Sequence, residues 1–386
     1  MEETREKAPE GVARGEFLLA GQVRSRRNPL IIAELGTSHG ADPVKARELV
    51  SAAAEAGAGC VKFQMVYADE ILHPNTGEVR LPGGMIRLYD TFKRLETPPE
   101  FYAEMKECVE GRGLIFLCTA FGPRSAAEIT ALKPALLKIA SPELNYGPLL
   151  AQTASAGLPL LLSTGVSKLG DIEAALEIAE EAAPEPARIC LLHCVTSYPA
   201  PERDYNLRVL ESLRAVFGVA VGVSDHSLDP ELVPALALTQ GAAVIEKHFC
   251  LSRNDPGLDD PIALPPEDFA RMVRAVGRAA AAAGGEAAFI EELKRERGAE
   301  LVEAVLGDGV KRLAPSERAN YERSNRSIHA LRDIQEGELI TAEITGILRT
   351  EKVLRPGLPP AWRDRILGRR ARRFIPAGEG IRLEDI

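Results

Sequence analysis

Short apolar runs alternate with longer amphipathic segments from residue 30 to about residue 285. Each run is almost continuously apolar, which is typical of a strand that is buried on both faces of a sheet. The segments between the runs carry helix signals, such as the stretch that starts at Asp42 and Pro43 and ends at Gly57. The runs are LIIAEL (30–35), CVKFQM (60–65), LIFLCTA (114–120), LLKIAS (136–141), LPLLLSTG (158–165), RICLLHCV (188–195), VAVGVSDH (219–226) and AVIEKHF (243–249).

Eight strand–helix units in about 255 residues predict an α/β fold, a (β/α)8 barrel that spans residues 15–285. An open doubly wound sheet is the alternative, but it would normally carry a glycine-rich phosphate turn after its first strand, and none is found. The segment 66–97 is too long for a plain connector between a strand and a helix. We expect it to form a lid or wall of a functional site.

The C-terminal part of the chain has a different pattern. ALRDIQEGELI (330–340) and ARRFIPAGEGI (371–381) share the pattern A-x-R-x-I-x-x-G-E-x-I. This internal repeat with its turn glycines predicts a small β-rich domain, residues 323–386, that is built from two related halves. The charged stretch 286–322, helical in character, is expected to be the linker.

Composition narrows the class of protein. The net charge of −9 argues against nucleic-acid binding, which normally uses a basic surface. No apolar run approaches the roughly 18 residues of a membrane span, and the N-terminus lacks the apolar core of a secretory signal. The six cysteines show no CxxC spacing, so buried thiols in a reducing compartment are expected. We therefore expect a cytoplasmic protein that binds neither membranes nor nucleic acids.

Polar residues gather at the C-terminal ends of all eight apolar runs, which is where (β/α)8 barrels place their active sites. Because side chains alternate along a strand, Lys62 and Gln64 are expected on the inner face while Val61 and Phe63 face the helices. The polar strand-end residues are Glu34, Lys62, Gln64, Thr119, Lys138, Ser141, Ser163, Thr164, His193, Ser224, Asp225, His226, Glu246, Lys247 and His248.

Two kinds of chemistry follow from these residue types. His226 and His248, on adjacent strands and close to a glutamate, are suited to a divalent ion such as Mn²⁺ or Zn²⁺. Lys62 and Lys138, with nearby hydroxyl groups, are suited to the phosphate or carboxylate of a small anion. Either lysine could instead partner a buried glutamate or form a Schiff base with a carbonyl substrate.

A set of motifs follows in a fixed order along the chain: IIAELG with His39, AGAGCVKFQ, FLCTAF, KIASPE, LSTG, LLHCVTSYPAP, VGVSDHSL, VIEKHF, RSIHALRDIQEGELIT and ILGRRARRFIPAGEGI. In these motifs and their order the chain resembles the bacterial sialic acid synthases, the N-acetylneuraminate synthase family, including their C-terminal antifreeze-like (SAF, β-clip) domain. The resemblance implies a transferase that condenses phosphoenolpyruvate with the open-chain aldehyde of an N-acylated amino sugar. It also implies a divalent metal ion, usually Mn²⁺.

The same resemblance implies roles for individual residues. His226 and His248 correspond to the metal ligands, and Glu34 to the active-site carboxylate. The C-terminal domain would reach over the barrel of a partner in a domain-swapped homodimer and contribute Arg349 or Arg355 to the N-acyl group of the sugar. The phosphoenolpyruvate-binding set would be Lys62, Gln64, Thr119, Lys138, Ser141, Ser163 and Ser224, and the other residues on the sugar side would be Glu143, Tyr198 and Asp259.

The chain departs from the family pattern at Ser38, Gly122, Asp260 and Pro265, where the family usually has Asn, Asp, His and Glu. None of these changes removes an expected metal or phosphoenolpyruvate residue, so they bear on the acceptor sugar. N-acetylmannosamine and a diacetamido-trideoxy sugar are both open. Two other functions are also open, namely a Schiff-base aldolase or lyase that uses Lys138 or Lys62, and a non-catalytic carbohydrate-binding protein.

Overall fold

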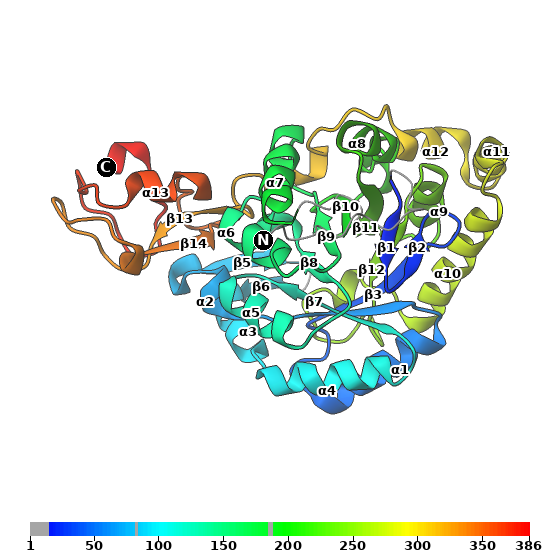
Figure 1. The fold of residues 1–386 in the computed structure, drawn as a ribbon, viewed down its shortest axis with the longest axis horizontal. Coiled ribbons are helices and arrows are strands. Elements are labelled where there is room, and N and C mark those ends of the chain that lie inside the picture. The colour runs from blue at the N-terminus through cyan, green and yellow to red at the C-terminus, as the bar shows by residue number, and fades with distance from the viewer. Residues whose placement is uncertain (1–14, 82–83, 184–187) are drawn as a thin grey trace, which may run out of the picture.

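Eight parallel strands close into a barrel (Figure 1) in a computed structural model that describes residues 15–81, 84–183 and 188–386. Their order around the barrel is β10-β11-β12-β3-β4-β7-β8-β9. All eight predicted strands are therefore confirmed. The strands are β3 (Leu30–Gly36), β4 (Cys60–Gln64), β7 (Ile115–Ala120), β8 (Leu137–Ile139), β9 (Leu160–Ser163), β10 (Ile189–Cys194), β11 (Ala220–Asp225) and β12 (Val244–His248).

A helix follows each barrel strand and covers its outer face. The first begins as the sequence predicts, because the Asp42 side chain accepts a hydrogen bond of 2.8 Å from the backbone N–H of Val44 and Pro43 opens the helix. The helices are α1 (Pro43–Glu55), α4 (Pro99–Glu110), α5 (Pro123–Ala131), α6 (Gly147–Ala154), α7 (Leu169–Ala182), α8 (Val209–Phe217), α9 (Leu232–Thr239) and α10 (Pro266–Ala281).

The N-terminal end of the barrel is closed by a hairpin of β1 (Phe17–Leu19) and β2 (Gln22–Arg24). Phe17 and Leu19 are fully buried and join an apolar cluster with inward-facing strand residues such as Leu30 and Ile32. Because hydrocarbon fills this end, the polar strand-end residues are left together at the opposite end. Val61 and Phe63 belong to the separate cluster that includes helix residues, as their strand parity predicts.

The segment 66–97 forms a small subdomain beside the C-terminal end of the barrel. It contains α2 (Ala68–Ile71), the hairpin of β5 (Glu78–Leu81) and β6 (Gly84–Arg87), and α3 (Leu88–Leu95). The C-terminal domain, orange to red in Figure 1, lies next to this subdomain, where α2 contacts β14 (Thr345–Arg349).

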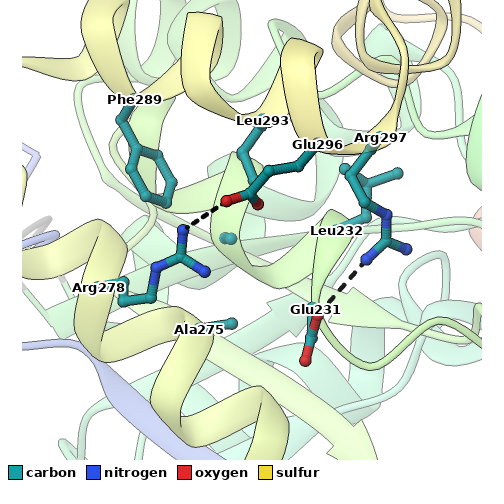
Figure 2. Close-up of a pocket in the computed structure, with 9 residues that line it drawn as sticks. Glu231, Leu232, Ala275, Arg278, Phe289, Leu293, Glu296 and Arg297 are labelled. Atoms are coloured by element: carbon teal, nitrogen blue, oxygen red, sulfur yellow. Dashed lines mark hydrogen bonds and ion pairs between the residues drawn. The ribbon is translucent and has the colours of Figure 1, made fainter.

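Part of the expected linker packs on the barrel. The segment 286–322 contains α11 (Glu286–Arg297) and α12 (Ala299–Leu306), whose apolar residues join the outer core of the barrel. Figure 2 shows how α11 attaches: Phe289 and Leu293 face α9 and α10, and Arg278 and Arg297 form ion pairs across the contact. The gap between these helices holds only about 20 Å³, so this region serves packing.

The C-terminal domain is built from two halves that pair with each other, as the repeat predicts. Its regular strands are β13 (Arg326–Ala330) and β14, which run antiparallel. The equivalent residues Ile334 and Ile375 exchange two backbone hydrogen bonds of 2.9 Å. Each half also repeats the other's contacts, since Gly337 N donates to Ala371 O and Gly378 N donates to Ala330 O. A short helix, α13 (Arg363–Ile366), completes the domain.

Candidate active site

A cavity of about 410 Å³ opens at the C-terminal ends of the barrel strands, between the barrel and the C-terminal domain. The segment 66–97 forms part of its wall, as expected. Six of the predicted site residues line it: Lys62, Gln64, Thr119, Tyr198, Asp259 and Arg349. The other lining residues are Thr37, Val66, Ile71, Leu88, Phe92, Phe121, Ala140, Pro142, Thr196, Ser197, Leu258, Ile262, Asn320, Ser324, Glu351 and Lys352.

Glu246 connects the two lysines that were predicted to bind an anion. Its carboxylate lies 2.9 Å from Lys62 Nζ and 3.4 Å from Lys138 Nζ. Ser224 Oγ donates a hydrogen bond of 2.9 Å to the same carboxylate. Both lysines are buried, and burial together with the charge of Lys62 lowers the pKa of Lys138 to about 8, although Glu246 opposes the shift. Glu246 therefore pairs with both buried lysines.

Glu34 lies on the other side of Lys62. Gln64 Nε2 donates a hydrogen bond of 2.6 Å to Glu34 Oε1, and Lys62 Nζ is 3.3 Å from Glu34 Oε2. Burial raises the pKa of Glu34 to about 7, in spite of the nearby Lys62. A carboxyl group with this pKa can gain or lose a proton near neutral pH, which is what a general acid or base requires.

Two predicted hydroxyl groups have no hydrogen-bond partner. Thr119 Oγ1 and Ser163 Oγ are buried and unpaired in the part of the chain that the structure describes. Buried hydroxyl groups are normally hydrogen-bonded, so both are free to donate to an anion held by Lys62 and Lys138. Ser141 Oγ, in contrast, accepts a hydrogen bond of 3.0 Å from Gly165 N, which fixes the position of its hydroxyl group.

His226 and His248 lie side by side, with their ring centroids 5.4 Å apart. Tyr198 stacks on His226 at 4.3 Å, and its hydroxyl group is 3.3 Å from His226 Nε2. His226 Nδ1 is held by Val195 O at 2.9 Å. His248 Nδ1 is buried without a hydrogen bond and lies 3.8 Å from Asp259 Oδ2. The structure thus brings together the two predicted metal ligands and two predicted residues of the sugar side.

The histidine pair fits a divalent ion only in part. The unpaired His248 Nδ1 is a free donor, and burial lowers the pKa of His248 well below its usual value, which keeps this imidazole neutral. However, the described residues contain no group of three or more His, Cys, Asp or Glu side chains arranged around one point. An ion held by His226 and His248 would therefore need oxygen atoms from water or substrate.

Behind the histidines, Lys247 and Asp225 form a buried ion pair of 2.6 Å. Lys247 Nζ also donates to Ser227 O at 2.6 Å, and the backbone N–H of His226 donates to Tyr205 Oη at 2.6 Å. These contacts fix the backbone of both strand ends. Tyr205 belongs to no strand-end pattern, so the sequence gives no signal for this role.

Glu143 does not line the cavity, although it was expected on the sugar side. It is fully buried, and its Oε1 accepts hydrogen bonds from Arg326 Nε at 3.0 Å and from Arg349 Nη2 at 2.6 Å. Glu143 thus orients Arg349, whose side chain lines the cavity. Arg326, also fully buried, donates to the barrel carbonyls of Glu70 and Phe121, so it joins the two domains. Arg326 was missed by sequence reasoning.

Of the two candidate arginines, Arg349 lines the cavity of this chain. Arg355 does not line the cavity but pairs with Asp385 at 2.8 Å within the C-terminal domain. Arg349 makes its contacts with the barrel of the same chain. The contact between domains is therefore described within one chain, and the domain-swapped homodimer stays a prediction.

Three of the four departures from the family pattern, Ser38, Asp260 and Gly122, have a local structural explanation. Ser38 Oγ donates a hydrogen bond to Asp260, so these two departing residues contact each other. At Gly122, an added Cβ would meet the Glu70 side chain at 2.5 Å. Glu70 instead accepts hydrogen bonds from the backbone N–H groups of Arg124 and Ser125, so it caps α5 from outside the helix.

This fold and site define a (β/α)8-barrel enzyme with buried lysines and a histidine pair at the C-terminal face. Comparison with known sequences agrees: the NeuB family model matches residues 49–288, and the SAF domain model matches residues 325–386. The chain belongs to the NeuB family, and it carries a C-terminal SAF domain.

Individual relatives extend over nearly the whole chain. The spore coat polysaccharide biosynthesis protein SpsE of Bacillus subtilis is 33% identical over 374 residues, which cover 96% of this chain and 97% of SpsE. Its crystal structure superimposes with a TM-score of 0.79, covering 96% of this chain and 99% of the other. The N,N'-diacetyllegionaminic acid synthase of Legionella pneumophila is 32% identical over 363 residues, covering 92% and 94% of the two chains.

Proposed function

We propose that this protein condenses phosphoenolpyruvate with the aldehyde of an N-acylated amino sugar to give a nonulosonic acid and phosphate. The observation that carries the proposal is a single cavity lined by Lys62 and Thr119 and also by Tyr198, Asp259 and Arg349. The first two residues offer a cation and a hydroxyl donor to an anion, and the other three offer hydrogen-bonding groups to a sugar. The name of the Legionella relative supports the reaction class.

In this proposal, Lys62 and Lys138 bind the carboxylate and phosphate of phosphoenolpyruvate, with the free hydroxyl groups of Thr119 and Ser163 as additional donors. C3 of the enol forms a bond to the aldehyde carbon, and the aldehyde oxygen takes up a proton. Water adds at C2, the C2–O bond to phosphate breaks, and phosphate leaves. Glu34, with its pKa near 7, exchanges the proton of the attacking water.

A divalent ion, Mn²⁺ by the family resemblance, is part of the proposal, with His226 and His248 as its protein ligands. When bound, the ion would act as a Lewis acid toward the aldehyde oxygen. The chain's own residues orient this region: Val195 O fixes the His226 ring, and Tyr198 covers that ring on the cavity side. Asp259 lies against His248, and burial raises the pKa of this carboxyl group to about 6.

The acceptor is proposed to be N-acetylmannosamine or a diacetamido-trideoxy sugar. The side of the cavity that includes Val66, Ile71, Leu88 and Phe92 is apolar, which suits a deoxy sugar with a methyl group at its end. A cytoplasmic location and a domain-swapped homodimer complete the proposal. The location is supported by the six free cysteines. Light scattering of the purified protein tests the dimer.

The deciding experiment measures phosphate release from phosphoenolpyruvate with Mn²⁺ and a panel of sugars, and identifies the product by mass spectrometry. The panel contains N-acetylmannosamine and 2,4-diacetamido-2,4,6-trideoxyhexoses. We expect release that depends on one sugar and is abolished by a chelator. Release without any sugar, or none with the whole panel, would contradict the proposed reaction.

A Schiff-base aldolase or lyase is the second candidate, favoured by the lowered pKa of Lys138. Such an enzyme would need no metal ion and would use free pyruvate. Treatment with pyruvate and borohydride would then attach a three-carbon adduct to Lys138, which peptide mass spectrometry detects. We expect no adduct, because Lys138 Nζ is close to Glu246 and serves as a cation.

A further inference from the structure

A turn of the C-terminal domain, residues 350–354, contributes to the lining of the cavity. Glu351 and Lys352 of this turn line the cavity together with Arg349 at the end of β14. Asn320, from the segment before the domain, also lines the cavity and is bonded to Lys352. Three charged lining residues, Arg349, Glu351 and Lys352, therefore come from one short stretch of the chain.

The backbone of the turn is held in an unusual conformation. Glu351 has a φ of 55°, in the left-handed region that side chains other than glycine rarely adopt. The N–H groups of Thr350 and Glu351 both donate to Arg323 O at 3.0 Å, and Arg323 Nη1 donates back to Glu351 O at 3.0 Å. A residue keeps such a conformation only where its surroundings impose it, and such residues concentrate at ligand sites.

The charges of this stretch are not equally satisfied. Arg349 is bound by Glu143, and Lys352 Nζ donates to Asn320 Oδ1. The Glu351 carboxylate forms neither a hydrogen bond nor an ion pair with any residue that the structure describes. Burial raises the pKa of Glu351, although Arg349 opposes the shift. Glu351 is half-buried and lines the cavity, so a ligand there that donates a hydrogen bond would meet a carboxylate with no competing partner among the described residues.

We propose that Glu351 determines which acceptor sugar is used, an inference that rests on the proposed function. Its carboxylate accepts a hydrogen bond from a hydroxyl or amide N–H of an uncharged acceptor. It repels an acceptor that carries a phosphate group at that end. Phosphoenolpyruvate is not the partner of Glu351, because its negative charges belong with Lys62 and Lys138 and a further carboxylate would oppose them.

The test compares the wild-type protein with Glu351→Gln and with Glu343→Gln. Glu343 is an exposed glutamate of the same domain that does not line the cavity, so it is a matched control. With saturating phosphoenolpyruvate, E351Q should raise the KM for the acceptor about tenfold, while the KM for phosphoenolpyruvate stays unchanged. E343Q should change neither constant. The kcat/KM for N-acetylmannosamine 6-phosphate, relative to the neutral sugar, should rise in E351Q.

Two further measurements separate recognition from a structural role. Glu351→Asn suits the left-handed backbone better than glutamate does, so it removes the carboxylate without weakening the turn. E351N should lose acceptor affinity as E351Q does. A deoxy analogue of the sugar that lacks the donor should bind the wild-type protein and E351Q equally well.

The outcomes also separate this inference from the proposed function. If the wild-type protein is active and E351Q and E351N have the same KM for the acceptor as the wild type, the role of Glu351 is overturned. The proposed reaction is then still supported. If the wild-type protein released no phosphate with any sugar, the reaction would be contradicted, and calorimetric titration of the sugars would still test Glu351. Equal affinity of the wild-type protein and E351Q in that titration would overturn the inference.

Discussion

Lys247 Nζ lies 2.6 Å from Asp225 Oδ2, and each of these two residues directly precedes one of the site histidines. They face each other in register across β11 and β12, and both are almost completely buried. Because side chains alternate along a strand, the ion pair points away from the barrel interior while His226 and His248 point into it. The buried pair therefore positions the histidines without touching the cavity.

We expect Lys247→Met to lower the free energy of unfolding by about 3–5 kcal/mol, because the Asp225 carboxylate would remain buried without its partner. The histidine pair should also lose its spacing, which would weaken Mn²⁺ binding. Urea denaturation and calorimetric titration with Mn²⁺ measure the two effects. Lys93 is exposed and forms only surface ion pairs, so Lys93→Met is the control. An equal loss of unfolding free energy in the two variants would contradict a stabilising role for the buried ion pair.

The pH dependence of activity depends on which role Lys138 plays. Its pKa is lowered to about 8, so its positive charge is complete below that value and lost above it. If Lys138 binds phosphoenolpyruvate as a cation, kcat/KM for phosphoenolpyruvate should fall as the pH rises through about 8. Lys138→Arg keeps the charge at all these pH values and should remove this fall. A Schiff-base nucleophile would instead gain activity over the same range.

The barrel and most of the strand-end cluster follow from local patterns. Each apolar run is a strand, and the alternation of side chains correctly separates Lys62 and Gln64 from Val61 and Phe63. These predictions succeed because two features can be recognised from a few neighbouring residues. One is the apolar run of a strand that is buried on both faces, and the other is the alternation of its side chains. The two-half construction of the C-terminal domain follows in the same way from the repeat, with Ile334 pairing with Ile375.

Contacts between distant residues could not be predicted. Arg326 and Glu143 are 183 residues apart, and neither belongs to a pattern that names the other. Glu70 caps α5 from a position 54 residues before Arg124, and no sequence pattern links the two. The hairpin that closes the barrel has strands of three residues, too short for a periodicity to appear. Such features depend on the arrangement of the whole fold.

The two arginines proposed for the acceptor should behave differently when they are removed. Arg349→Ala should raise the KM for the acceptor about tenfold or more, because this side chain lines the cavity and is oriented by Glu143. Arg355→Ala should leave that KM unchanged and lower the stability of the C-terminal domain, since Asp385 would lose a partner. Steady-state kinetics and thermal unfolding measure the two effects. The reverse result would assign the acceptor contact to Arg355.

The histidine pair makes the most direct prediction about a metal ion. His226→Ala and His248→Ala should each weaken Mn²⁺ binding by at least about tenfold, because each removes one of only two protein ligands. His248→Gln keeps a polar group in the same space and should also fail to bind the ion. Electron paramagnetic resonance of free Mn²⁺ measures the affinity without turnover, and denaturation by urea checks that the variants fold. Mn²⁺ affinity unchanged in folded His248→Ala would refute the assignment of this histidine as a ligand.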